Sequence, residues 1–171
     1  MSLSLASLLS PEHVHPQFEG TSKKRLLENI ARAIANDEDQ AELLLDGLQA
    51  RERLGSTGVG QGIAIPHCRA DIPEPIVHLF ALSTPVDFDA LDGQDVDFLC
   101  VLLVPTDANE VHLNLLREVI QIFSEPESRE PLGLAFDQIS LFNAVQRLFE
   151  GPICLALFPS SCDPAVATPP P

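Results

Sequence analysis

The stretch RERLGSTGVGQGIAIPHC at residues 51–68 decides how the rest of the chain is interpreted. A charged segment runs through a glycine-rich turn into a short apolar segment and stops at Pro66-His67. Glycine adopts positive φ without steric cost, so the four glycines let the backbone turn sharply and approach a ligand closely. Pro66 restricts its own φ and keeps Ile65 extended. The pattern therefore predicts a loop that presents the imidazole of His67 with little conformational freedom.

The same stretch closely resembles the active-site segment of the IIA domains of the bacterial phosphotransferase system, in particular the nitrogen-regulatory type and its fructose- and mannitol-type relatives. The resemblance covers about residues 8–150. It implies a mixed β-sheet covered by helices. Further similar segments, in the order of the family, are LSPE at 9–12, TSKKRLLENIA at 21–31, PVDFDALDGQDVDFLCVLLVP at 85–105 and His112-Leu113.

Apolar residues at helical spacing predict four helices along the chain. The predicted ranges are 22–35, 38–52, 109–125 and 140–150. Gly55 is expected to end the second helix, and Ser140 is expected to cap the fourth. Between the third and fourth helices, Pro131 and Gly133 should keep any helix short. The residues expected to face the core are Leu43, Leu44 and Leu48 in the second helix and Val111, Leu115, Val119, Ile122 and Phe123 in the third.

Two apolar runs, residues 77–83 and 97–104, are interpreted as buried strands bounded by prolines. Helices that alternate with short buried strands indicate an α/β fold. We therefore expect one domain at residues 1–150, a IIA domain by resemblance, with a mixed β-sheet flanked by helices. Residues 151–171 have no amphipathic period and end in a proline tract, so they are expected to form a mobile tail.

The composition narrows the classes of partner. With 10 Lys and Arg against 25 Asp and Glu, the formal net charge is −15, which argues against binding to nucleic acid. A basic protein partner fits this charge better, although acidity that serves solubility alone would look the same. No apolar run approaches the roughly 20 residues of a membrane helix, and no basic leader precedes the apolar N-terminal segment. We expect a cytoplasmic protein without membrane insertion.

His67 is the predicted phosphoryl acceptor. Imidazole suits this role because its pKa near neutrality leaves a nucleophilic nitrogen, and the phosphorus–nitrogen bond that forms is easily broken again. A backbone carbonyl or a carboxylate should hold the other ring nitrogen. An isolated histidine would more often be a loop or core residue, but the GSTGVGQGIAIPH context favours function. In the family that the stretch resembles, the histidine of GIAIPH carries the phosphoryl group.

Three further sources of phosphoryl contacts are predicted. His112 lies in the first turn of a predicted helix, where backbone N–H groups favour an anion and a neutral imidazole donor. Arg51 stands 16 residues before His67, and the family has an active-site arginine at that spacing and a second active-site histidine at the position of His112. Ser56 and Thr57 resemble a phosphate cradle, although an ordinary turn has the same composition.

The other histidines and the cysteines carry weaker signals. His13 and His15 form an H-x-H pair without a third ligand nearby, so a solvated loop is preferred to a metal site. His78, in a predicted strand, is interpreted as structural. Cys68 stands where the family usually has glycine, so its backbone is either ordinary, which we favour, or strained. Its side chain is interpreted as a tolerated small residue, with a redox sensor as the alternative. No C-x-x-C pair occurs, so the four cysteines are expected to be free thiols.

These signals predict a regulatory phosphocarrier of the nitrogen-related phosphotransferase system. By resemblance, phosphate would pass from phosphoenolpyruvate through an HPr-like protein to His67, giving a phosphohistidine intermediate without a cofactor or metal. One alternative is a sugar-specific IIA component, for fructose or mannitol, that passes phosphate to a IIB domain. Another is a binding module that has lost phosphorylation, for which Cys68 is the one hint. The sequence does not identify the regulatory targets.

Overall fold

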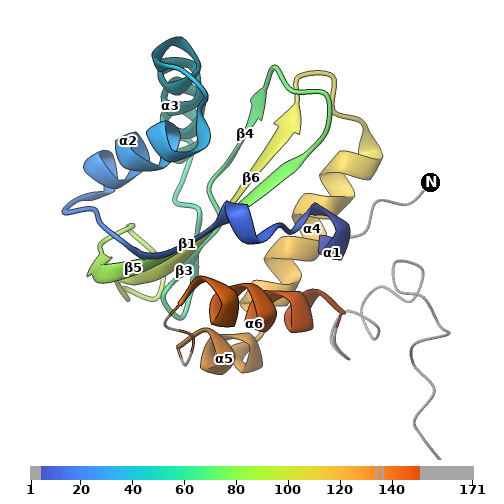
Figure 1. Ribbon diagram of the computed structural model, residues 1–171. Coiled ribbons are helices and arrows are strands. Elements are labelled where there is room, and N and C mark those ends of the chain that lie inside the picture. Colours follow the sequence, from blue (N-terminus) through green and yellow to red (C-terminus); the bar gives the residue numbers. More distant parts are fainter. Residues whose placement is uncertain (1–4, 134, 136, 151–171) are drawn as a thin grey trace, which may run out of the picture.

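The computed structural model describes residues 5–133, 135 and 137–150. A six-stranded mixed sheet lies between two layers of helices, with α2 (Lys23–Ile34) and α3 (Glu38–Arg53) on one side (Figure 1). This arrangement confirms the predicted α/β class. The helices of the second layer are α1 (Leu5–Leu8), α4 (Glu110–Ser124), α5 (Arg129–Gly133) and α6 (Gln138–Glu150), and short 3-10 helices occupy Pro11–His13 and Pro126–Ser128.

The sheet is built around a long antiparallel pair, β5 and β6. Strand β1 pairs in parallel with the outer edge of β5, and β2 pairs antiparallel with β3. Both β3 and β4 run parallel to β6, one after the other along the same edge. The strands are β1 (Val14–Phe18), β2 (Gly58–Gly60), β3 (Ile63–Ala64), β4 (His67–Ala70), β5 (Ile76–Val86) and β6 (Val96–Pro105).

The central strand β6 is buried on both faces. Phe98, Cys100 and Leu102 point into the core beneath α4 and α6, whereas Leu99 and Val101 point into the core beneath α2 and α3. Side chains alternate between the two faces of a strand, so a strand covered on both sides reads as a continuous apolar run. This explains why the sequence from 97 to 104 lacks the polar alternation of a half-exposed strand.

The helix boundaries agree with the local signals. Ser22 caps α2 by accepting a hydrogen bond from the Arg25 N–H, and Asp37 caps α3 through the Gln40 N–H. Gly55, at a φ of 147°, follows the end of α3 as expected. The helix between α4 and α6 has only five residues and contains Pro131, as the sequence also indicated.

Four details of the sequence interpretation are wrong. Leu43 is 71% exposed, because successive helix residues are 100° apart and Leu44 takes the inward position. Val111 is 42% exposed, because the first turn of α4 contributes no residue to the core. Ser140 does not cap α6, which begins at Gln138, and its N–H donates to the carboxylate of Asp137 at 2.7 Å. Strand β5 also runs through Pro85, which was expected to bound it, within a stretch of irregular register between Ala81 and Val86.

Three further expectations concern the membrane, the cysteines and the tail. Among the described residues, no helix combines the length and the apolar character that a bilayer crossing requires. Cys68 and Cys100 are free thiols. The expected mobile tail, with Cys154 and Cys162, lies outside the described residues.

Candidate functional site

His67 begins β4, and the segment that leads to it is held against the central strand. Pro66 accepts a hydrogen bond from the Leu102 N–H at 3.0 Å, between the pairings of β3 and β4 with β6. The Nδ1 atom of the half-buried His67 lies 2.9 Å from the carbonyl oxygen of Ile65. Because a carbonyl only accepts, Nδ1 carries the proton and Nε2 carries the lone pair. The partner that the sequence could not identify is therefore a backbone carbonyl.

Arg51 contacts the other ring nitrogen. It lies in the last turn of α3, and its Nε donates to His67 Nε2 at 3.0 Å. Its Nη1 donates to the carbonyl oxygen of Gly55 at 2.9 Å, which fixes the guanidinium. The structure thus brings together two of the predicted site residues, which lie 16 positions apart in the chain.

The surroundings of His67 favour its neutral form. Burial lowers the pKa of His67 below its ordinary value, and the positive charge of Arg51 lowers it further. The hydrogen bond to Ile65 and the negative charge of Glu52 raise this pKa, but they do not reverse the shift. A neutral imidazole keeps a lone pair on Nε2, here hydrogen-bonded by Arg51, and this is the form that can act as a nucleophile once that bond is exchanged.

The glycine-rich loop needs its glycines at the turn between β2 and β3. Gly60 and Gly62 have φ values of 96° and 80°, where a side chain would be strained. Between them, the Gln61 N–H donates to a carboxylate oxygen of Asp92 at 2.8 Å. This contact ties the tip of the loop to the turn that precedes β6.

The hydroxyl groups of Ser56 and Thr57 are engaged within the protein. Ser56 Oγ donates to the carbonyl oxygen of Phe88 and accepts from the Gly58 N–H at 3.1 Å. Thr57, which is 5% exposed, donates its hydroxyl to Glu52 at 2.6 Å and its N–H to the same carboxylate at 3.1 Å. These two predicted phosphoryl-binding residues therefore shape the loop next to His67.

Sequence reasoning missed two charged residues beside the site. The side chain of Glu52 is only 7% exposed, and it pairs with the ammonium group of Lys23 at 2.7 Å. Lys23 is the first residue of α2, and its ammonium also lies 3.4 Å from the carbonyl oxygen of Phe88. Nothing in the sequence distinguishes this buried carboxylate from the many exposed ones.

His112 takes part in the cap of α4. Asn109 accepts hydrogen bonds from the Val111 and His112 N–H groups, and His112 Nδ1 accepts from the Asn109 N–H at 3.3 Å. In its neutral form the ring therefore carries a proton on Nε2, which can donate. Among the described residues, no hydrogen bond joins His112 to His67.

Cys68 lies in ordinary extended backbone, as favoured from the sequence. It pairs with Leu103 in the sheet, and it is not among the described residues with positive φ. Burial raises the pKa of its thiol to about 11, so the thiolate that oxidation requires is scarce at neutral pH. A β-carbon added to Gly47 of α3 would lie 3.1 Å from the Cys68 sulfur, so the cysteine fills the space above that glycine.

The other three histidines gather beside β1 and β5. The solvated loop expected for His13 and His15 is wrong, because His13 lies in a 3-10 helix and His15 in β1, and both rings stack on neighbours. The ring of His78 stacks on that of His13 at 4.2 Å between centroids, and its Nδ1 lies 3.1 Å from His15 Nε2. His15 also stacks on Phe80 at 4.5 Å. No group of three or more metal-ligating side chains with suitable geometry occurs in the part of the chain that the structure describes.

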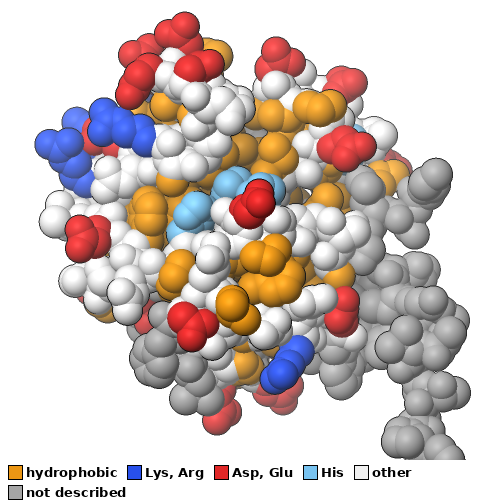
Figure 2. Space-filling model, in the orientation of Figure 1, with side chains coloured by type: hydrophobic (Ala, Val, Ile, Leu, Met, Phe, Trp, Pro, Cys, Tyr) orange, Lys and Arg blue, Asp and Glu red, His pale blue; other side chains and the backbone are white. Residues whose placement is uncertain are grey.

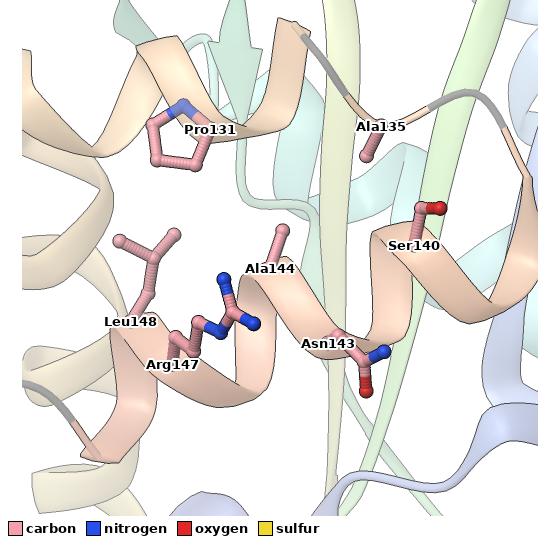
Figure 3. A pocket seen from close by; sticks show the side chains of 7 residues that line it. All are labelled: Pro131, Ala135, Ser140, Asn143, Ala144, Arg147 and Leu148. Atoms are coloured by element: carbon pink, nitrogen blue, oxygen red, sulfur yellow. The ribbon is translucent and has the colours of Figure 1, made fainter.

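A pocket of about 450 Å³ between α5 and α6 lies apart from these residues (Figure 3). The guanidinium of Arg147 points toward Pro131 across this space, and Asn143 lies one turn earlier on α6. None of the predicted site residues lines this pocket. The predicted site around His67 is instead an arrangement of side chains at the start of β4.

Comparison with known proteins places this geometry in context. The family described as "Phosphoenolpyruvate-dependent sugar phosphotransferase system, EIIA 2" matches residues 7–147. The chain is 44% identical over 146 residues to the nitrogen regulatory protein of Pseudomonas aeruginosa, with 84% of this chain and 95% of that protein covered. It is 33% identical over 145 residues to the nitrogen regulatory protein of Bradyrhizobium diazoefficiens, with the same coverage.

Solved structures show the same fold. The nitrogen regulatory protein IIA-Ntr from Neisseria meningitidis superposes with a TM-score of 0.75 at 33% identity, covering 85% of this chain and 98% of that one. IIA mannitol from Escherichia coli superposes with a TM-score of 0.61 at 14% identity, covering 82% and 98%, and this likeness concerns the fold alone. The matches confirm the resemblance that the GIAIPH stretch indicated.

Proposed function

Because the chain belongs to the EIIA 2 family of the phosphoenolpyruvate-dependent sugar phosphotransferase system, we propose that it is a regulatory phosphocarrier of the nitrogen-related branch. It accepts a phosphoryl group on Nε2 of His67 from an HPr-like donor protein in the cytoplasm. The resulting phosphohistidine makes it a stoichiometric carrier, and the state of His67 is the signal that target proteins read.

The arrangement of the two ring nitrogens of His67 carries this proposal. Nδ1 is occupied by the Ile65 carbonyl, whereas Nε2 has a lone pair that faces the guanidinium of Arg51. A lone pair beside a fixed positive charge is what an acceptor of an anionic group needs, because the charge offsets that of the incoming phosphoryl group.

The transfer requires positioning more than covalent help from the protein. The Nε2 lone pair attacks phosphorus in line, the donor's bond to phosphorus breaks, and the donor keeps that electron pair. The proton on Nδ1 stays on the ring, where the Ile65 carbonyl stabilises the added positive charge. Arg51 then exchanges its hydrogen bond to Nε2 for hydrogen bonds to phosphoryl oxygens.

The remaining site residues have supporting roles in this proposal. Ser56 and Thr57 hold the loop that borders the phosphoryl group, since their hydroxyls already bond to Phe88 and Glu52. His112 assists transfer as a neutral donor through Nε2–H, and it does not carry phosphate. Its position in the first turn of α4 adds backbone N–H groups and the positive end of the helix dipole.

The relatives favour the regulatory branch. The two relatives compared above, both named nitrogen regulatory protein, match 84% of this chain, whereas a fructose-specific EIIA component of Haloferax volcanii matches 55% of it at 36% identity. A sugar-specific component that passes phosphate to a IIB domain remains the second candidate because of that match. A module without phosphorylation is disfavoured, because Cys68 does not distort the backbone next to His67.

Incubation with labelled phosphoenolpyruvate, the first enzyme of the system and an HPr-like protein tests the acceptor. We expect about one acid-labile label per chain in the wild type and none in His67→Ala. His112→Ala is the matched control, because it should reach the same final labelling more slowly. Full labelling of His67→Ala would refute the assignment.

A further inference from the structure

We propose that the partly buried ion pair between Lys23 and Glu52 positions the phosphoryl-accepting imidazole, so that Glu52 is a positioning residue of this site. The inference rests on the proposed function, since the position of His67 matters for transfer only if His67 accepts phosphate. It concerns two residues that the motif does not contain and that belong to different helices, α2 and α3.

Both carboxylate oxygens of Glu52 are fully used. Oε1 accepts from the Thr57 N–H at 3.1 Å and from the Lys23 ammonium at 2.7 Å, and Oε2 accepts from the Thr57 hydroxyl at 2.6 Å. Two bonds from one carboxylate to the N–H and hydroxyl of a single residue fix both its backbone and its side chain. Glu52 therefore anchors the start of the glycine-rich loop to the end of α3.

A chain of hydrogen bonds leads from this anchor to the imidazole. The Thr57 carbonyl accepts from the Ile65 N–H at 2.9 Å, and the Ile65 carbonyl accepts from His67 Nδ1–H at 2.9 Å. Glu52 is thus linked to Nδ1 of His67 through Thr57 and Ile65. Arg51, its neighbour in α3, contacts Nε2 directly. Two consecutive residues of one helix hold the two nitrogens of the ring.

Lys23 adds a second branch to the same loop. Its ammonium lies 3.4 Å from the Phe88 carbonyl, and that carbonyl also accepts from Ser56 Oγ–H. Ser56 Oγ in turn accepts from the Gly58 N–H at 3.1 Å. The branches from Lys23 and Glu52 therefore converge on residues 56–58, where β2 begins.

A gain in the free energy of unfolding does not by itself explain why Glu52 is buried beside Lys23. The cost of removing two charges from water often exceeds their attraction, so a buried ion pair adds little net stability. What such a pair does supply is a defined geometry for the groups bonded to it. Another ion pair of α2, Arg25–Glu28, provides a comparison, because it joins residues one turn apart within a single helix and its side chains are 69% and 19% exposed.

The test compares the Lys23–Glu52 pair with the Arg25–Glu28 pair in the full chain. Lys23 also lies 3.6 Å from the exposed carboxylate of Asp89, so Glu52→Gln is the variant that removes only the inner contact. Glu52→Gln and Lys23→Met break the first pair, Lys23→Arg keeps its charge, and Glu28→Gln and Arg25→Met break the second pair. One measurement is the rate of label transfer at saturating HPr-like donor. The other is hydrogen exchange of the Thr57 amide in the unphosphorylated protein, which does not depend on transfer.

Displacement of a reacting group by about 1 Å can cost roughly 100-fold in rate, so we expect Glu52→Gln and Lys23→Met to slow transfer by about 10- to 100-fold. The KM for the donor should stay within about twofold of the wild-type value, because the docking surface is unchanged. Exchange of the Thr57 amide should accelerate by about tenfold in Glu52→Gln. Lys23→Arg should restore most of the rate, and both variants of the Arg25–Glu28 pair should match the wild type.

A wild-type rate in Glu52→Gln, or equal slowing in Glu28→Gln, would overturn the inference. If the wild type itself takes up no label, the proposed function fails, and hydrogen exchange still decides this inference. In that case, unchanged exchange of the Thr57 amide in Glu52→Gln would refute the positioning, and faster exchange limited to residues 56–58 would support it.

Discussion

Among single residues, His67 is the one whose two ring nitrogens have clearly different hydrogen-bond partners. The Ile65 carbonyl fixes the proton on Nδ1, and the Arg51 guanidinium marks Nε2 as the nitrogen that faces an incoming anion. Burial and this guanidinium both lower the pKa of His67, which keeps the ring neutral. The same arginine that would hold a phosphoryl group thus also prepares the nucleophile.

The pH dependence of transfer follows from this lowered pKa. Only neutral His67 is nucleophilic, so the rate should stay constant as the pH falls from 8 to about 6.5, the ordinary pKa of histidine, and decline only below it. Nuclear magnetic resonance titration of the His67 ring in the free protein checks the sign. Arg51→Gln removes a positive charge and should raise this pKa, and an unchanged or lower value would contradict the argument.

His112 gives a prediction about the transition state. Loss of one donor to a developing charge costs roughly 100-fold or more in rate, so His112→Ala should slow transfer from a phosphorylated donor by this factor. The substitution also removes the ring from the capping box with Asn109. His112→Gln can still complete that box and serves as the stability control in urea denaturation. A wild-type transfer rate in His112→Ala would make this histidine a capping residue only.

Cys68 gives a prediction about packing. Because its backbone is unstrained and its side chain lies over Gly47, glycine at this position should not relieve strain. We expect Cys68→Gly to lower the free energy of unfolding by roughly 1 kcal/mol, as glycine does within strands, and to leave phosphorylation unchanged. Urea denaturation measures the first and label uptake the second. Increased stability would show that the backbone here is strained after all.

At the scale of the element, strand β1 is held to the sheet by rings as well as by backbone pairing. It forms the outer edge next to β5, and its His15 stacks on Phe80 of β5. The ring of His78 lies beside those of His13 and His15. Figure 2 shows histidine side chains grouped on this face among hydrophobic ones. Such stacking favours uncharged rings.

The histidine group should make the fold sensitive to acid. Burial, with the neighbouring charges of His13 and His15, lowers the pKa of His78 to about 3, whereas the unfolded chain titrates near 6.5. The unfolded state therefore takes up a proton first, and stability that is full above about pH 6.5 is lost as the pH falls toward 3. Because of this difference in the pKa of His78 between the folded and unfolded states, the free energy of unfolding should fall by about 2 kcal/mol as the pH falls from 6.5 to 5.

Chemical denaturation at pH 7.5 and pH 5 measures this loss. His78→Phe keeps an aromatic ring that cannot titrate, so the difference between the two pH values should shrink by about 2 kcal/mol. Val77→Ala, at the preceding buried position of β5, should lower stability by a similar amount at both pH values. A pH difference in His78→Phe equal to that of the wild type would assign the acid sensitivity to other groups.

At the scale of the whole molecule, charge is unevenly distributed. Six of the ten Lys and Arg residues lie in α2 and α3. Most of the Lys and Arg side chains visible in Figure 2 group at the upper left, another lies in the lower part of this face, and Asp and Glu side chains are spread around them. With a formal net charge of −15, most of the surface should attract a basic partner and repel an acidic one.

Association with a basic donor protein should therefore depend on salt. We expect the second-order rate of phosphoryl transfer at low donor concentration to fall by about tenfold or more between roughly 0.02 and 0.5 M potassium chloride. The rate at saturating donor should change little, because the chemistry within the docked complex is screened less. Sucrose in place of salt controls for viscosity. A rate independent of salt would mean that the acidity serves solubility alone.

The sequence by itself determined the features that depend on neighbouring residues. The caps at Ser22, Asp37 and Asn109, the glycine-dependent turn before β3 and the extended lead-in to His67 are all set within a few positions of the chain. Strands β5 and β6 could be predicted for the same reason, because a strand that is buried on both faces is a continuous run of apolar residues in the sequence. The prediction of Arg51 as a phosphoryl-binding residue came instead from the family resemblance, and its hydrogen bond to His67 was not predicted.

Only the tertiary structure decided which groups hold the site together. The Ile65 carbonyl at Nδ1, the carboxylate of Glu52 on Thr57, and the meeting of Lys23 with Phe88 depend on how distant segments cross. The amino-acid sequence does not distinguish a buried glutamate from an exposed one, and it does not show which of the many backbone carbonyls will accept a given hydrogen bond. Their roles arise from burial and direction, and both properties exist only once the helices have packed on the sheet.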